Sequence, residues 1–218
     1  MEKSAVMNDI VIRQERPQEY REVEWVIREA FWDVYQPGAD EHYLAHILRD
    51  SADFIPELDL VAEVDGKIVG NIMYTRSWIE REGGGRVETV TFGPVGVLPE
   101  YHRKGIGGQL IRRSAKMARD MGFPAILIHG DPDYYRRLGF VSAKQLGIAN
   151  REGTYPMAHQ ILQLAPDALQ GISGRAYESQ AMEIDPHAAA DFDGGFSPKE
   201  KRKTQSQEKF IRISQTYL

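Results

Sequence analysis

Residues 92–110 constrain the fold of this chain more than any other segment, and they read FGPVGVLPEYHRKGIGGQL. The pattern predicts a strand that ends at Leu98, a turn rich in small and basic residues, and a helix that begins near Gly105. Glycines let a backbone approach a ligand closely, and the first amides of a helix have no partner within it. Together with the helix dipole and the charges of Arg103 and Lys104, this arrangement predicts an anion site suited to a pyrophosphate.

Two familiar phosphate loops do not match this segment. A dinucleotide fingerprint needs a third glycine where Leu110 stands. A nucleoside-triphosphate loop needs Gly-Lys followed by Ser or Thr, and the chain has no such triplet. What remains is a tight Gly105-Ile106-Gly107 turn that follows a basic pair.

Strand and helix patterns alternate along most of the chain. Apolar runs on either side of Asp65-Gly66 predict a hairpin. We expect strands at 9–15, 58–64, 67–79, 86–97, 124–129 and 157–164, and helices at 17–37, 40–51, 105–121 and 131–139. Antiparallel hairpins followed by one strand–helix–strand crossover predict an α+β (mixed α/β) fold.

The composition changes after Pro166. Residues 166–218 are richer in polar side chains, and 199–203 form a charge run. We expect one domain at 1–165 and a carboxy-terminal extension at 166–218 that packs on it in part and ends in a mobile tail.

Charge and composition exclude several classes of function. Acidic residues outnumber basic ones by 32 to 27, and a net charge of −5 argues against a general nucleic-acid binder. The chain has no cysteine, which excludes disulfides, thiolate metal sites and a cysteinyl intermediate. Its start is polar, and no apolar stretch approaches the roughly 20 residues that cross a bilayer. We therefore expect a cytoplasmic protein whose partners include neither a membrane nor a nucleic acid.

A second block, 131–140, reads DPDYYRRLGF and follows the glycine turn at a characteristic distance. With this block the region 9–164 resembles the GNAT superfamily of acyl-CoA-dependent N-acetyltransferases. The family loop has Gln or Arg, two residues, Gly, one residue, and Gly or Ala; this chain has His102 at the first position and Gly105 and Gly107 at the others. Residues 130–135, Gly-Asp-Pro-x-Tyr-Tyr, indicate a subgroup of that family.

The resemblance implies a GNAT fold, in which helices flank a twisted, mostly antiparallel sheet that splays at a central parallel pair. It also implies acetyl-CoA as cosubstrate and no metal. The residues that would hold CoA are Val95, Gly96, Val97, His102, Arg103, Lys104, Gly105, Ile106, Gly107 and Gly108. Tyr135 matches the family tyrosine that protonates the leaving thiolate, whereas its neighbour Tyr134 is expected to face the core.

Because no cysteine can carry the acetyl group, we expect direct transfer to a primary amine within a ternary complex. The acceptor would be a small molecule or a peptide. The general base stays open between Glu88, Asp131 and a water chain. The family forms the acceptor site from the first two helices, the loop near 34–43 and late strands, where Asp33, Asp40 and Glu41 would favour a cationic amine.

Other readings stand beside this one. A CoA-binding sensor without catalysis would keep the same loop, and an interaction protein would act through the extension. A homodimer is left open. His42 and His46 lie one helical turn apart, but no third ligand is evident, so a solvated helix face is favoured over a metal site. His129 is expected to line the acetyl site, with a catalytic role as the alternative.

Overall fold

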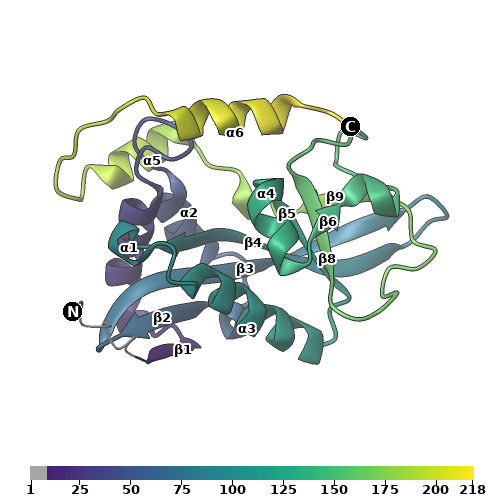
Figure 1. Cartoon of the computed structure of the whole chain (residues 1–218), viewed down its shortest axis with the longest axis horizontal. Helices are drawn as coiled ribbons and strands as arrows, with labels where there is room; N and C mark the ends of the chain where they lie inside the picture. Colours follow the sequence, from purple (N-terminus) through teal and green to yellow (C-terminus); the bar gives the residue numbers. More distant parts are fainter. Residues whose placement is uncertain (1–8) are drawn as a thin grey trace, which may run out of the picture.

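The hairpin of β3 and β4 lies at the centre of the sheet in the computed structural model, which describes residues 9–218 (Figure 1). The strands on this side of the sheet are β1 (Ile10–Gln14), β2 (Leu60–Val64), β3 (Lys67–Arg81) and β4 (Arg86–Val97). They follow one another in antiparallel pairs. Residues 1–8, which hold most of the polar start and begin the predicted domain, lie outside the described residues.

The other side of the sheet begins with a parallel strand. The remaining strands are β5 (Ala125–His129), β6 (Val141–Ser142), β7 (Ile148–Ala149), β8 (His159–Gln163) and β9 (Gly174–Glu178). β5 pairs parallel with β4, and β8 and then β6 follow it in antiparallel pairs. Among residues 9–218 the nine strands form a single sheet with antiparallel strands around the β4–β5 pair, which confirms the predicted mixed α/β fold.

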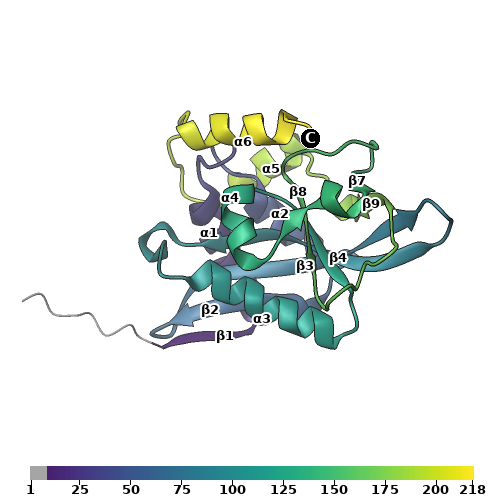
Figure 2. The same ribbon diagram turned by 45° about the vertical axis from the view of Figure 1, so that its right-hand side comes forward.

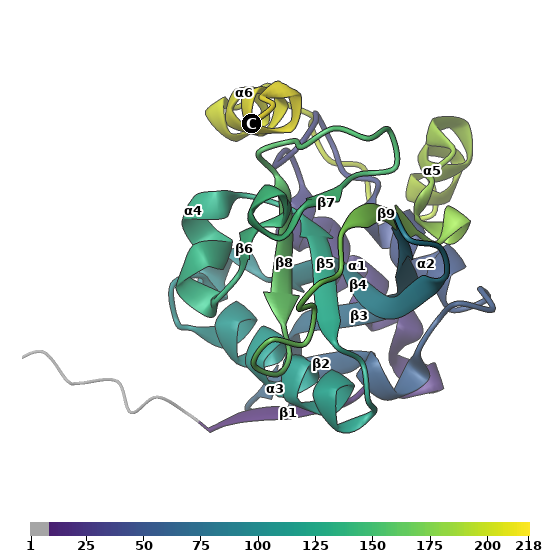
Figure 3. The same ribbon diagram turned by 90° about the vertical axis from the view of Figure 1, so that its right-hand side faces the viewer.

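Helices cover both faces of this sheet (Figures 2 and 3). They are α1 (Tyr20–Phe31), α2 (Glu41–Leu48), α3 (Ile106–Asp120), α4 (Pro132–Tyr135), α5 (Pro186–Asp193) and α6 (Gln205–Gln215), with 3-10 turns at Pro17–Glu19, Pro56–Leu58, Pro99–Tyr101, Arg136–Leu138, Ala143–Leu146 and Gln180–Met182. A Cβ at Gly96 would lie 3.1 Å from Ala30 of α1, whereas a Cβ at Gly70 would meet Leu110 of α3. Gly70 lies opposite Val97, the residue after Gly96, and successive residues of a strand face opposite sides of the sheet. α1 and α3 therefore lie on opposite faces of the hairpin.

Helix α3 packs through small side chains as well as large ones. Its buried face consists of Ile106, Leu110, Ile111, Ser114, Ala115 and Ala118. Ser114 donates to Leu110 O (2.8 Å) and contacts the hydroxyl of the fully buried Tyr74 (2.8 Å), so its polar atom has partners inside the core. Met121, the last residue of the predicted helix 105–121, follows the end of α3 and is 44% exposed.

The segment after residue 165 contributes to the sheet and to the helical layers. β9 pairs with the outer half of β3, from Ser77 opposite Glu178 to Arg81 opposite Gly174. α5 contacts α2, and α6 lies along the edge of the molecule above α1 and α4 (Figures 1 and 2). Thr204 and Gln207 begin α6 and both donate to Asp33 O (2.8 and 3.1 Å). The boundary at 165 stays a prediction.

His42 lies inside the contact between α2 and α5, so the expectation of a solvated face was wrong for this residue. It is fully buried, its ring packs against Phe192 and Phe196, and its Nε2 lies 3.2 Å from Asp193. Burial lowers the pKa of His42 to about 4. His46 is half exposed and its Nδ1 lies 2.9 Å from Glu24.

No helix among residues 9–218 is both long and apolar enough to cross a membrane.

We expect acid to destabilise the fold through His42. The unfolded chain binds this proton near pH 6.5 and the folded chain near pH 4, so the contribution is complete above pH 6.5 and is lost as the pH falls through that interval. The loss amounts to roughly 3 kcal/mol at most. His42→Phe should therefore lose less stability than the wild type between pH 7 and pH 4 in urea unfolding, whereas a substitution of the exposed His187 should behave as the wild type does. An equal decline in all three proteins would assign the acid sensitivity to other groups.

Candidate functional site

The loop between β4 and α3 presents backbone amides to solvent. Arg103 and Gly105 both have left-handed backbone angles, with φ of 61° and 79°. Alternation of this kind turns successive N–H groups to one side and makes an anion-binding concavity. The first bond of α3 runs from Gln109 N to Gly105 O (3.0 Å), so the amides of Ile106, Gly107 and Gly108 lack intrahelical acceptors.

His102 holds this loop against the strand. Its Nε2 lies 2.8 Å from Val97 O, and because a carbonyl only accepts, the ring nitrogen donates. The Lys104 ammonium lies 4.5 Å from the centre of the Tyr101 ring. Arg103 and Lys104 are both exposed and place positive charge at the loop.

The two central strands separate beside this loop. The parallel pairing of β4 with β5 consists of Val90 opposite Ile126 and Thr91 opposite Leu127. In the pairing of β3 with β4, Ile72 lies opposite Val95 and Tyr74 lies opposite Phe92. Between these two pairs β4 has one residue more than β3, and it bulges there. A bulge re-aims the strand that carries it. The backbone of β4 beyond Thr91 therefore borders an opening instead of a neighbouring strand.

A cavity of about 710 Å³, which we call the β4–α3 pocket, occupies this opening. The predicted residues that line it are Val95, Gly96, Val97, His102, Arg103, Gly105, Ile106, Gly107 and Gly108; Lys104 lies outside the lining. The other lining residues are Ala30, Phe31, Val34, Tyr35, Tyr101, Asp131, Tyr134, Tyr135 and Arg137. Loop, strand edge and tyrosine block, which are distant in the sequence, thus meet around one cavity.

The two adjacent tyrosines enter the pocket in different ways. Tyr135 is 9% exposed, and its ring packs against Phe92 and Phe140, with centroids 5.9 and 5.4 Å apart. Burial raises the pKa of Tyr135 well above its ordinary value, so the phenol stays protonated. Tyr134 is 42% exposed and its hydroxyl lies 3.0 Å from where a Cβ on Gly107 would be. The expectation that Tyr134 faces the core was wrong, since both rings border the cavity.

The carboxylates named from the sequence already have partners. Asp131 accepts from Asp133 N (2.9 Å) at the start of α4 and pairs with Lys209 of α6. Glu88 is exposed and pairs with Arg76 at 2.7 Å. Lys209 and Phe210 are neighbours on α6, and the Phe210 ring packs against the ring of Tyr35 with centroids 4.2 Å apart. Through these two contacts, with Asp131 and with Tyr35, α6 covers one side of the pocket.

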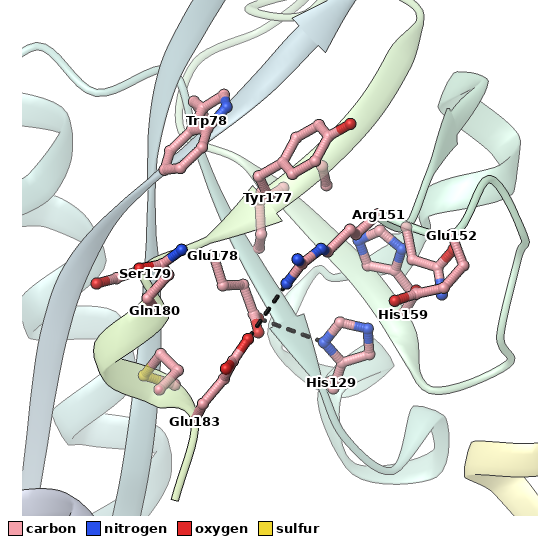
Figure 4. A pocket seen from close by; sticks show the side chains of 14 residues that line it. Trp78, His129, Arg151, Glu152, His159, Tyr177, Glu178, Ser179, Gln180 and Glu183 are labelled. Carbon is pink, nitrogen blue, oxygen red and sulfur yellow. Dashed lines mark hydrogen bonds and ion pairs between the residues drawn. The ribbon is translucent and has the colours of Figure 1, made fainter.

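A second cavity of about 370 Å³, the β5–β9 pocket, lies near the ends of those strands (Figure 4). His129 of β5 and Glu178 of β9 point toward each other in it, with Nδ1 3.3 Å from Oε1. The Thr91 hydroxyl of β4 has one hydrogen, which it shares between Leu127 O (2.7 Å) and Glu178 Oε1 (3.3 Å). The ring of His159 stacks on His129 at 4.8 Å, and its Nδ1 is buried with no hydrogen-bond partner in the described part of the chain.

The polar groups of this pocket have distinct charge states. Burial alone would raise the pKa of Glu178. The hydrogen bond from His129, the electrostatic interaction with the His129 ring and the hydrogen bond from Thr91 outweigh burial and hold that pKa below its ordinary value. Burial, with a smaller contribution from His129, lowers the pKa of His159 to about 3. At neutral pH the pocket thus contains an ionised Glu178 and a neutral His159.

The sequence named His129 but missed Glu178. That residue ends β9, a five-residue strand in the region that composition marked as an extension. The stretch 174–178 has only the apolar Ala176 between Arg175 and Tyr177, which is too short a pattern to predict a strand in the main sheet.

Comparison with known sequences gives one consistent family. Residues 21–140 match the model of the acetyltransferase (GNAT) family. The chain is 33% identical over 114 residues to YjhQ of Escherichia coli K12, named as an uncharacterized N-acetyltransferase, and the match covers 52% of this chain and 62% of YjhQ. It is 28% identical over 166 residues to YhbS of the same strain, also named as an uncharacterized N-acetyltransferase, with 76% and 93% covered.

Solved structures with a similar fold carry related names. The Escherichia coli YhbS structure in complex with CoA has a TM-score of 0.71 and 25% identity, and the match covers 83% of this chain and 95% of that one. A GNAT family acetyltransferase from Brucella melitensis in complex with acetyl-CoA has a TM-score of 0.64 and 30% identity, with 81% and 99% covered.

We expect Gly130→Ala to destabilise the protein by displacing Tyr135. A Cβ on Gly130 would lie 2.2 Å from Cε2 of the Tyr135 ring, so the ring or the end of β5 must shift. Overpacking of this kind costs roughly 1–3 kcal/mol, measured as a lower thermal unfolding midpoint. Gly83→Ala is the matched control, because a Cβ there meets nothing within 4 Å. Equal midpoints for the two variants would contradict the close contact between Tyr135 and the strand.

Proposed function

The chain belongs to the acetyltransferase (GNAT) family and is an acyltransferase, and from this premise we propose that it transfers the acetyl group of acetyl-CoA to a primary amine. The single observation that supports this most is the β4–α3 pocket, which unites the loop amides, the free edge of β4 and Tyr135 around one cavity. The relatives crystallised with CoA and acetyl-CoA support the same cosubstrate.

The donor set of the pocket fits CoA. The amides of Ile106, Gly107 and Gly108, at the positive end of α3, suit the pyrophosphate, and Arg103 and Lys104 add charge beside it. The backbone of Val95 and Val97 would bond the amides of the pantetheine arm, because buried strand groups need partners. An amide of the same strand would polarise the thioester carbonyl, an effect worth roughly 3 kcal/mol when the donor is preorganised.

Transfer follows from a direct attack in a ternary complex. The amine nitrogen forms a bond to the thioester carbon, the carbon–sulfur bond breaks, and the thiolate takes the proton of the Tyr135 hydroxyl. A buried phenol that stays protonated can perform this step. The chain lacks cysteine, so a cysteinyl acetyl intermediate has no residue to form on.

A non-catalytic CoA sensor is the alternative function, and nothing in the site favours it, since the pocket contains a proton donor as well as the anion site. The subgroup marked by residues 130–135, the domain boundary at 165, the cytoplasmic location and a homodimer stay predictions from the sequence.

Calorimetric titration with acetyl-CoA tests the cosubstrate. We expect micromolar binding by the wild type and at least a tenfold loss in Gly107→Val, because the side chain would enter the cradle next to the Tyr134 hydroxyl. NAD and ATP should not bind, and Gly83→Val, in the distant β3–β4 turn, should bind as the wild type does. Folded protein without affinity for acetyl-CoA would refute the proposed function.

Tyr135→Phe tests the proton donor. We expect kcat to fall about 100-fold, the usual scale for removal of a general acid, while the Kd for acetyl-CoA changes little. Tyr134→Phe should instead raise the KM for acetyl-CoA, because that hydroxyl lies beside Gly107. Thiol release measured with a panel of amines gives both constants. Equal loss of turnover and of acetyl-CoA affinity in Tyr135→Phe would make Tyr135 a structural residue.

A further inference from the structure

We propose that the β5–β9 pocket receives the acceptor as a small cationic primary amine and that His129, positioned by Glu178, removes its proton. This inference rests on the proposed function and adds to it a second cavity, a proton acceptor and a substrate class. The sequence leaves the general base open between Glu88, Asp131 and a water chain, and Glu178 is not one of these candidates.

The pocket lies against the same opening of the sheet as the β4–α3 pocket. Phe92 of β4 contacts Tyr135 and Phe140 on the α4 side. Its neighbours along the strand alternate: Thr91 bonds Glu178, and a Cβ on Gly93 would lie 2.9 Å from Met182. Glu178 and Met182 both line the β5–β9 pocket. The β5–β9 pocket therefore lies on the face of β4 opposite to Tyr135.

His129 stands where this separation begins. Leu127 is the last residue of β5 paired with β4, and His129, two positions further, faces the same side of the sheet. An amine in the β5–β9 pocket would thus reach an acetyl group held between the strands while its nitrogen contacts the His129 ring. Met182 lines the β5–β9 pocket behind Gly93, and its flexible side chain can adapt to a ligand.

Glu178 sets the tautomer of His129. An ionised carboxylate only accepts hydrogen bonds, so Nδ1 of His129 carries the hydrogen of their 3.3 Å contact, and the lone pair of the neutral ring is then on Nε2. Thr91 holds the same Glu178 oxygen from β4. Glu178 is therefore a positioning residue that also stabilises the cation formed when His129 takes a proton.

The other titratable groups around His129 together favour a cationic ligand. They are His159 on β8, Glu178 on β9, Arg151 and Glu152 in the turn after β7, and Glu183 after the last 3-10 turn. Arg151 pairs with Glu183 at 3.2 Å, which leaves the carboxylates in excess. His159 is neutral, and its buried Nδ1 is a polar atom without a partner among the described residues.

The shape of the pocket limits the size of the amine. A volume near 370 Å³ suits a small molecule better than a folded protein segment. Trp78 and Tyr177 stack in parallel at 5.7 Å along one wall, which offers aromatic surface to an apolar or cationic group (Figure 4).

The protons balance in this scheme. The ammonium of the acceptor gives one proton to Nε2 of His129, and the neutral amine attacks the thioester carbon. The carbon–sulfur bond breaks, the thiolate takes the Tyr135 proton, and the second proton of the amine nitrogen restores the phenol. The products are the acetylated amine and CoA thiol, and His129 releases its proton to solvent.

Glu41 is another candidate general base and has to be distinguished from the pair of His129 and Glu178. Burial raises the pKa of Glu41, at the start of α2, to about 7, a value suited to a general base. It accepts from Asp40 N (3.1 Å) and does not line the β5–β9 pocket. Glu41→Gln is therefore the matched comparison for substitutions of His129 and Glu178.

The experiment measures kcat/KM for an amine against pH, together with the Kd for acetyl-CoA, in the full chain. We expect His129→Gln to lower kcat/KM at least 100-fold near neutral pH, with recovery above the pKa of the amine, and with an unchanged Kd. Glu178→Gln should cost about tenfold and move the acidic limb of the profile to lower pH. A merely structural role for Glu178 would not move that limb.

The outcomes separate the two proposals. Loss of acetyl-CoA binding in the wild type would overturn the proposed function and this inference with it. Normal binding with an unaltered pH profile in His129→Gln, or a lost limb in Glu41→Gln instead, would overturn the inference alone. If His129→Gln fails to fold, Glu178→Gln carries the same test.

An amine panel tests the substrate class. Small cationic monoamines and diamines should exceed both an amine that carries a carboxylate and a lysine-containing peptide by at least tenfold in kcat/KM. Glu152→Lys, at the exposed rim, should raise the KM for the cationic amines several-fold and leave the Kd for acetyl-CoA unchanged. Preference for the carboxylated amine or for the peptide would overturn the assignment of a small cationic acceptor.

Discussion

The separation of β4 from β5 after Thr91 and Leu127 is the constraint on which the site depends. A parallel pair that continued would fill both strand edges with hydrogen bonds and leave no place for a ligand. The pair ends early because β4 bulges near Gly93 and because β5 is only five residues long. The polar backbone exposed by this break must find other partners, and the β4–α3 and β5–β9 pockets lie beside it.

Helices and side chains keep that opening in place. α1 presses against Gly96 on one face, and α3 meets Val97 and Gly70 on the other. His102 ties the loop to the carbonyl of Val97, so the glycine turn and the strand edge keep a fixed relation. On the far side, Gly130 admits the ring of Tyr135 to the end of β5. These contacts hold the backbone that frames the opening in place.

Local patterns predicted most of this architecture. The strand that ends near Val97, the helix after Gly105 and the hairpin at Asp65-Gly66 follow from apolar spacing and turn chemistry, which act over a few residues. The resemblance of the sequence to the family assigns the tyrosine block and the glycine turn to one site. The described residues place both around one cavity, although the role of each remains a prediction.

Features that depend on long-range contacts could not be predicted from the sequence. His42 has the spacing of a surface residue, and only the docking of α5 buries it. Tyr134 was expected in the core because helical aromatics often are, but α4 is a single turn and both of its tyrosines reach the cavity. Glu178 lies in β9, a strand too short to be predicted from its sequence pattern. This strand is stabilised by its pairing with the far end of β3.

The position of β9 in the chain also has a consequence for synthesis. The residues that line the β4–α3 pocket lie between Ala30 and Arg137, whereas the β5–β9 pocket needs residues up to Glu183. Chains emerge from the ribosome amino terminus first. The lining of the first cavity is therefore synthesised some 45 residues before that of the second, at roughly 5–20 residues per second an interval of a few seconds. During that interval the nascent chain holds the lining of one cavity without that of the other, and α6, which covers one side of the first cavity, follows after both.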